Sequence, residues 1–330
     1  MKCDSCGKDF SKLKGYEGEQ FCAWCHAQVL KRAAAAPKLD DIFADILLFK
    51  TPGVGRESND DRNARRENVL LYLYNPPAEF LEDPYWKLMH TKWTSFLATL
   101  CDKPYDDVKF KRMGGRLYNY DLEITFLKEK TPVCMIKAEF KHNANTIDGL
   151  PEYLSPAANK PYFDVTYGDY FYDNYVDKVC SHSEQARLLK PTKPEYIKFL
   201  YQNEYKKNPF FSCLYETELT DKEFYKNKSG LVKESIQTYL QTYLPTINLK
   251  MISDDIRQRQ QGKVFILWNL KDFKSDVIRD DEMEIIKADT IKNKNTILAV
   301  SKAGTVHEML LRWKNHLGVL YPAWQISLTR

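Results

Sequence analysis

Apolar and polar positions follow two different periods between residues 83 and 143. Asp83-Pro84 provides a favourable cap and first position for a helix. Apolar residues then recur at helical spacing, with Cys101 near the end of the run; they are Tyr85, Leu88, Met89, Phe96, Leu97 and Leu100. Three alternating segments follow, at 108–112, 116–126 and 133–141. We therefore expect a buried helix followed by a three-stranded meander, the opening of a mixed α/β core.

Similar patterns predict elements on both sides of this core. The predicted helices are 64–74, 168–179 and 229–244, the strands are 263–270 and 296–300, and a hairpin joins 310–316 to 319–328 through Leu317-Gly318. Arg257 and Arg259 are expected to flank a loop. The tyrosines between residues 148 and 179 lie in an acidic segment, which repels a phosphate backbone, so we expect them to pack within the protein.

The eight cysteines fall into two groups. Cys101, Cys134, Cys180 and Cys213 are scattered among apolar neighbours, as buried free thiols are. The other four form two close pairs separated by fifteen residues, and they are Cys3, Cys6, Cys22 and Cys25. Four thiolates satisfy tetrahedral Zn²⁺, so these cysteines predict a structural zinc site, with reactive thiols as the alternative. A hairpin between the pairs and a helix after Cys25 would resemble a treble-clef finger.

Length and composition place this finger in a larger protein. The finger would occupy residues 1–36 and a linker 37–63; residues 64–330 would form the main domain, with a basic β region from about 245. No apolar run reaches the roughly 18 to 20 residues of a spanning helix, and the start of the chain does not resemble a secretory signal. We expect a soluble intracellular protein, in cytoplasm or nucleus, with no membrane partner.

Net charge is only +4, but the charge is unevenly distributed. Residues 287–316 contain six Lys or Arg and two acids, whereas residues 151–180 contain five acids and two Lys. The basic residues are Lys287, Lys292, Lys294, Lys302, Arg312 and Lys314. This stretch is the predicted nucleic-acid surface, although a solvated lysine-rich face would have the same composition.

Strand alternation places a set of chemically useful side chains on one face. On the second strand Asp121 points away from Leu122, and on the third Glu139 and Lys141 point away from the apolar residues. If the two strands are antiparallel neighbours, Asp121 lies beside Glu139 and Lys141. Carboxylates suit a hard cation such as Mg²⁺, and a lysine can orient a water or stabilise developing charge.

An acid two residues before a lysine also occurs elsewhere by chance. Glu204-Tyr205-Lys206, Asp107-Val108-Lys109 and Asp272-Phe273-Lys274 share this spacing. The third of these is a real competitor because it follows a strong strand. Only Glu139-Phe140-Lys141 follows a helix, a strand, a glycine turn and a strand-borne Asp. The alternative interpretation of that triad is a surface ion pair.

With these features, residues 83–143 resemble the PD-(D/E)xK (restriction-endonuclease-like) nuclease superfamily. The resemblance implies an αβββαβ core, a divalent metal, and cleavage that leaves 5′-phosphate and 3′-hydroxyl ends. By this resemblance Asp121 and Glu139 are magnesium ligands and Lys141 positions water. Tyr120 replaces the usual proline. No acid lies on the helix after Pro84, so the third catalytic acid is assigned to Glu67, with Glu82 as the alternative.

The leading expectation is an Mg²⁺-dependent (or Mn²⁺-dependent) endonuclease acting on DNA, most simply double-stranded. Arg116, Asn143, Arg312 and Lys314 are the candidate DNA contacts, and the zinc finger assists binding. The sequence leaves a homodimer open. Two other functions also fit the sequence: a non-catalytic zinc-containing module that binds nucleic acid or protein, and a ribonuclease.

Overall fold

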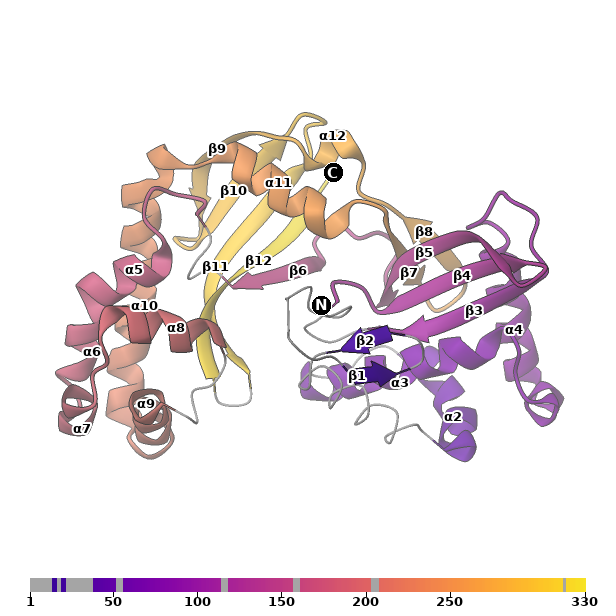
Figure 1. Cartoon of the computed structure of the whole chain (residues 1–330), viewed down its shortest axis with the longest axis horizontal. Coiled ribbons are helices and arrows are strands. Elements are labelled where there is room, and N and C mark those ends of the chain that lie inside the picture. The colour runs from indigo at the N-terminus through magenta and orange to yellow at the C-terminus, as the bar shows by residue number, and fades with distance from the viewer. Residues whose placement is uncertain are drawn as a thin grey trace. The chain divides into compact units, whose positions relative to one another are not determined.

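The computed structural model describes residues 14–16, 19–21, 38–51, 56–113, 118–156, 161–202, 208–316 and 319–330. The chain forms two units (Figure 1). Unit 1 comprises Met1–Ile147 and Gly262–Val277, and unit 2 comprises Asp148–Gln261 and Ile278–Arg330. The predicted mixed α/β class is confirmed. The sequence pattern gave no sign that residues 64–330 are divided in this way.

Unit 1 is built on a five-stranded sheet of order β3-β4-β5-β7-β8. Its strands are β3 (Asp107–Arg112), β4 (Leu122–Lys128), β5 (Thr131–His142), β7 (Lys263–Trp268) and β8 (Phe273–Asp276). All neighbours are antiparallel except β5 and β7, which are parallel. The predicted meander is therefore confirmed, with β4 beginning later than expected.

Helices cover one face of this sheet and provide its core (Figure 1). They are α2 (Leu39–Asp45), the 3₁₀ turn η1 (Ile46–Phe49), α3 (Arg56–Leu73), the 3₁₀ turn η2 (Ala78–Glu82) and α4 (Pro84–Leu97). Part of the expected linker, 37–63, is thus helical. The physical reason is that Ile42, Ile46 and Phe49 recur at helical spacing and are fully or almost fully buried.

The start of α4 agrees with its sequence signal. The carboxylate of Asp83 accepts hydrogen bonds from the backbone N–H groups of Tyr85 and Trp86, at 2.8 and 2.9 Å. These bonds satisfy two donors that a helix N-terminus leaves unpaired. Trp86, which follows this cap, is fully buried, so the cap also fixes a large core side chain.

Unit 2 combines a five-stranded antiparallel sheet with a group of helices (Figure 1). The strand order is β6-β12-β11-β10-β9. The strands are β6 (Pro151–Pro156), β9 (Ile285–Lys292), β10 (Thr296–Ser301), β11 (Val306–His316) and β12 (Val319–Thr329). The predicted C-terminal hairpin is confirmed, with Val306 paired to Thr329 and His316 to Val319.

The helical part of unit 2 is longer than the sequence pattern indicated. Its elements are α5 (Tyr167–Phe171), the π-helical turn η3 (Tyr172–Val176), α6 (Asp177–Cys180), α7 (Glu184–Leu188), α8 (Lys193–Gln202), α9 (Pro209–Thr220), α10 (Lys222–Tyr243), the 3₁₀ turn η5 (Leu244–Thr246), α11 (Leu249–Gln260) and α12 (Asp280–Met283). Arg257 and Arg259 lie within α11, so the predicted loop there is wrong. Buried Ile252 and Ile256, four residues apart, hold this segment as an amphipathic helix.

The tyrosine-rich segment packs inside unit 2, as expected. Tyr162, Tyr167, Tyr170 and Tyr175 are all buried. The ring centroids of Tyr167 and Tyr239 are 5.2 Å apart in an edge-on arrangement. These rings therefore build the core of unit 2 and do not form a base-stacking surface.

The N-terminal part of the chain is described only as a short hairpin. Strand β1 (Lys14–Tyr16) pairs antiparallel with β2 (Glu19–Phe21). This hairpin lies between the two cysteine pairs, where the sequence placed it. The four cysteines of the predicted zinc site, Cys3, Cys6, Cys22 and Cys25, lie outside the described residues.

Candidate active site

Asp121 stands immediately before β4, at the point where the backbone ladder to β5 begins. Its N–H donates to the carbonyl of Ala138 at 2.9 Å, and its Oδ2 accepts from the N–H of Phe140 at 2.9 Å. The carboxylate thus takes a backbone donor of β5 as a fixed partner. Because Leu122 is fully buried in the core, alternation directs Asp121 to the other face of the sheet.

Glu139 and Lys141 lie on the same face of β5. The Nζ atom of Lys141 is 2.6 Å from Oε1 of Glu139, and their side chains are 18% and 13% exposed. Lys263, the first residue of β7, pairs with Oε2 of the same carboxylate. Both oxygens of Glu139 therefore have a lysine partner.

The third carboxyl group comes from α3. Oε2 of Glu67 accepts from Nε of Arg112 at 3.1 Å, and Arg112 also donates to the side chain of Asn68 at 3.0 Å. Glu82, the alternative for the third acid, ends η2 and is exposed. The helix that contributes an acid is therefore α3, and α4 contributes only core residues to this region.

The three carboxyl groups are close enough to change one another's ionisation. Burial raises the pKa of Glu67 to about 7, and the negative charges of Asp121 and Glu139 add to the effect. Burial also raises the pKa of Asp121 to about 6, with the charge of Glu139 as the next cause. The Phe140 N–H, Lys141 and Lys263 oppose this increase. The structure thus brings together Glu67, Asp121, Glu139 and Lys141, and it crowds negative charge there.

The donor chemistry of this cluster fits a hard divalent cation. Carboxylate oxygens are what Mg²⁺ and Mn²⁺ prefer, and a bound cation would counteract the burial and the repulsion that together raise the two pKa values. Within the part of the chain that the structure describes, no group of three or more His, Cys, Asp or Glu side chains is arranged to hold a metal ion. Two carboxylates completed by waters and a phosphate form the smaller set that remains.

Comparisons with known proteins give no further guide. No protein-family model matches the chain, and neither a curated protein nor a solved structure matches it. The residues of the cluster and their geometry are therefore what indicate the function.

The remaining predicted DNA contacts are placed as follows. Asn143 directly follows β5, is exposed, and has a φ of 56°, a left-handed conformation that asparagine tolerates better than most residues. Arg312 is half-buried on β11 of unit 2. Arg116 and the side chain of Lys314 lie outside the described residues.

The competing acid–lysine motifs have simpler structural explanations. Asp272 forms an ion pair with Lys92 on α4, with a distance of 2.5 Å, and its side chain is 63% exposed. Asp107 accepts a hydrogen bond from the N–H of Val108, its neighbour on β3, at 2.8 Å. Residues 203–207, which contain Glu204-Tyr205-Lys206, lie outside the described part of the chain.

Sequence reasoning missed Lys263. This lysine is separated from Glu139 by 124 positions, with most of unit 2 between them. The only local signal is a lysine at the start of an apolar strand, after Gly262 in a left-handed conformation (φ 72°). Alternation then places it on the same face as Phe265, whose ring centroid is 4.7 Å from the lysine Nζ.

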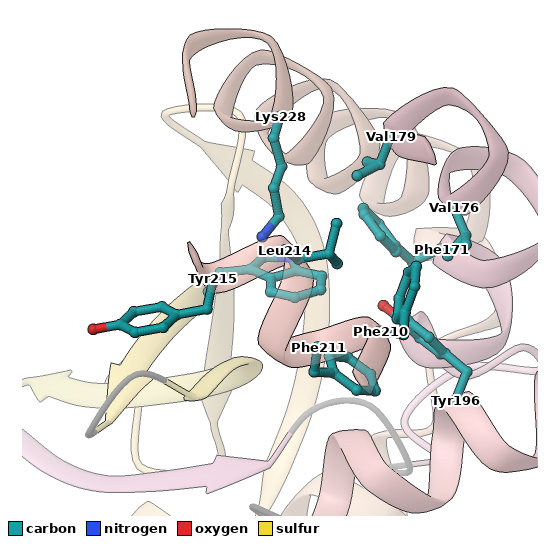
Figure 2. Close-up of a pocket in the computed structure, with 10 residues that line it drawn as sticks. Phe171, Val176, Val179, Tyr196, Phe210, Phe211, Leu214, Tyr215 and Lys228 are labelled. Atoms are coloured by element: carbon teal, nitrogen blue, oxygen red, sulfur yellow. The ribbon is translucent and has the colours of Figure 1, made fainter. Parts of the chain in front are cut away.

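A separate hollow in unit 2 has a different character. Aromatic and aliphatic side chains line it, and it holds about 450 Å³ including its opening (Figure 2). Its charged lining residue is Lys228, which pairs with Glu218. None of the carboxyl groups of the cluster in unit 1 lines this pocket.

Proposed function

We propose that unit 1 is a metal-dependent nuclease domain that hydrolyses phosphodiester bonds of DNA, with duplex DNA as the preferred substrate. The observation that supports this most directly is the meeting of Asp121, Glu139 and Lys141 from adjacent strands with Glu67 from a preceding helix. A surface ion pair would not require a third, largely enclosed carboxyl group (13% exposed) from another element.

The order of elements in unit 1 also supports the proposal. A helix, three antiparallel strands and a later strand parallel to the third occur in the order of the PD-(D/E)xK αβββαβ core. Helix α11, which immediately precedes that parallel strand in sequence, belongs to unit 2. In the proposed assignment the first segment of unit 2, Asp148–Gln261, lies between β5 and β7 and extends the usual connection.

The proposed roles follow from the chemistry of each group. Asp121 and Glu139 would hold Mg²⁺ or Mn²⁺, which when bound neutralises charge on the phosphoryl oxygens and acidifies a water. Lys141, 18% exposed and fixed against Glu139, would orient the attacking water and stabilise negative charge. Glu67, held by Arg112, would accept a hydrogen bond from that water.

The sheet face that carries the cluster offers cations for a phosphate backbone. Lys109 on β3 and Lys137 on β5 are exposed, and alternation places Lys137 on the same face as Glu139. Register pairs Lys109 with Thr125 and Lys137 with Glu123, so both belong to the face opposite the helical core. In this proposal these lysines position DNA, and Asn143, Arg116, the zinc finger and the basic β region with Arg312 and Lys314 add contacts.

The direct test is incubation of supercoiled plasmid with and without Mg²⁺. We expect nicked or linear product only with Mg²⁺, and loss of at least about 100-fold in rate for Glu139→Gln and Asp121→Asn. These near-isosteric variants keep the shape of the site, and thermal unfolding verifies that they fold. Asp272→Asn, which removes an exposed carboxylate, is the matched control and should cleave normally. Undiminished cleavage by Glu139→Gln would refute the assignment.

The pairing of Glu139 with two lysines favours a second candidate function for unit 1. A carboxylate with both oxygens occupied can be a purely structural ion pair, and unit 1 would then be a non-catalytic module that binds nucleic acid or a protein. This candidate predicts retention of DNA with no metal requirement and no nicking. Including labelled RNA as a competing substrate in the same assay separates a ribonuclease from both.

A further inference from the structure

Lys263 is an unusual residue in this chain because its charged end is buried. The residue is 3% exposed, and its Nζ has three neighbours from unit 1. They are Oε2 of Glu139, the carbonyl oxygen of Asn119 at 3.2 Å, and the ring of Phe265 at 4.7 Å. A lysine on the surface would instead extend its amine into water.

Keeping this amine out of water has a cost that only specific partners can offset. Burial lowers the pKa of Lys263, and the charge of Glu139 is the main opposing influence. Removing an ammonium group from water without a partner costs several kcal/mol. The three neighbours therefore explain how the lysine remains buried, but they do not explain why a lysine is there and not an apolar residue.

Through its two oxygen acceptors, Lys263 links one acid of the proposed site to the backbone beside the other. Glu139 is one of them, and Asn119 stands two residues before Asp121. Asp121 in turn is tied to β5 through Ala138 and Phe140. The ammonium group thus spans the backbone leading into Asp121 and the carboxylate of Glu139.

We infer that Lys263 is a positioning residue of this site, which fixes the Glu139 carboxylate relative to Asp121 while Lys141 serves the reaction. The inference depends on the proposed nuclease function. The same ammonium repels a cation bound by the two acids, so it improves the geometry and weakens cation affinity. These opposite effects distinguish a positioning role from a merely structural one.

Unit 2 contains a matched structural pair for comparison. Lys228 is 8% exposed, its Nζ pairs with Glu218, and burial lowers its pKa as well. Figure 2 shows its amine directed between the helices, beside Leu214 and Tyr215. Lys228→Met therefore reports what the loss of a buried lysine does to stability alone.

The experiment compares Lys263→Met, Lys263→Arg and Lys228→Met with wild type. The measurements are Mn²⁺ affinity by titration calorimetry without DNA, the KM and kcat of cleavage, and thermal unfolding. For Lys263→Met we expect about 100-fold lower kcat at nearly unchanged KM, since small misplacements of reacting groups have effects of that size. We also expect Mn²⁺ affinity to rise about tenfold or more because a nearby positive charge is removed.

The other two variants separate charge from position. Lys263→Arg keeps the charge, so Mn²⁺ affinity should stay near that of wild type, while kcat falls to an intermediate value because the guanidinium cannot occupy the same point. Lys228→Met should keep the wild-type kcat, KM and Mn²⁺ affinity for each folded molecule. If Lys263→Met does not fold, Lys263→Gln is measured instead. Its amide can still donate to the acceptors but carries no charge, so Mn²⁺ affinity should rise about tenfold while kcat falls only to an intermediate value.

Wild-type kcat in folded Lys263→Met overturns the inference, and so does a lower kcat without a rise in Mn²⁺ affinity. Where Lys263→Gln replaces that variant, an unchanged Mn²⁺ affinity in the folded protein overturns it. Failure of the proposed function would look different. In that case Glu139→Gln would leave Mn²⁺ binding and cleavage unchanged, and the result would not depend on Lys263.

Discussion

Replacing Glu139 by alanine leaves the ammonium group of Lys263 buried without its carboxylate. The side chain of Lys263 is 2% exposed, so it cannot turn to water, whereas Lys141, at 18% exposed, can. The remaining acceptor is the neutral carbonyl of Asn119. Glu139→Ala should therefore destabilise unit 1 mainly through Lys263.

The size of the effect can be bounded from both sides. Removing one partner of a buried ion pair costs about 3–5 kcal/mol. Alternatively, the buried lysine can lose its proton. At pH 7 this costs about 1.4 kcal/mol for each unit by which the pH lies below the ordinary lysine pKa of 10.5, or about 5 kcal/mol. Loss of Glu139 also relieves repulsion with Asp121 and Glu67, so we expect the lower end, about 3 kcal/mol.

The same reasoning predicts a double-mutant cycle and a pH dependence. Glu139→Ala combined with Lys263→Met removes both charges, so its stability should return to within about 1 kcal/mol of wild type. In the single variant, the unfolded state binds more protons at Lys263 than the folded state. Its deficit should therefore shrink as the pH rises from 7 to 9, when proton loss becomes less costly.

Urea unfolding in EDTA measures these free energies, and hydrogen exchange of β5 and β7 assigns them to unit 1. Glu218→Ala with Lys228→Met provides the corresponding cycle in unit 2. Equal stability of the Glu139→Ala single and double variants, or a deficit that grows towards pH 9, would show that Lys263 is not held by Glu139.

Three further results are expected. Burial lowers the pKa of His142 from 6.5 to about 4. The free energy of unfolding should therefore be undiminished by this group above pH 6.5 and should fall by about 1–2 kcal/mol towards pH 4, after allowance for the partial exposure of the ring. Urea unfolding of His142→Gln should lack this loss. The double variant Lys109→Gln/Lys137→Gln should bind DNA more weakly in Ca²⁺, and the slope of log affinity against log salt concentration should become shallower by about 0.9 per lysine. Lys87→Gln, which changes an exposed residue of α4, should alter neither. Unchanged slopes in filter binding would exclude this face as the DNA-binding surface. Asp83→Ala should cost about 1 kcal/mol in thermal unfolding and Asp83→Asn much less, because only the first removes the cap of α4.

Local patterns were sufficient for most elements of the fold. The capped helix α4 and the alternation of Leu122, Ile124 and Phe126 could be read directly, since the interval between apolar residues reflects the face that is buried. The helix 39–45 was missed because it lies between Pro37 and the Gly- and charge-rich stretch 52–63, whose composition is typical of a linker. Arg257 and Arg259 were assigned to a loop because their polar surroundings hid the pair Ile252 and Ile256.

The site was predictable only where it is local in sequence. Asp121, Glu139 and Lys141 come from neighbouring strands, so one pairing assumption brings them together. Glu67 required an assumption about which helix packs beside the sheet. Lys263 reaches the cluster through the parallel pairing of β5 with β7, and no local pattern encodes a pairing across 124 positions.

The interleaving of the two units has a consequence for synthesis of the protein. Strand β5 ends at His142, but its parallel neighbour β7 begins only at Lys263, 121 positions later. At about 5–20 residues per second, the nascent chain presents the unpaired edge of β5 for roughly 6–24 s. An open strand edge is a template for association with other chains. Nascent chains that stall between these two strands should therefore be especially prone to aggregate and to recruit chaperones.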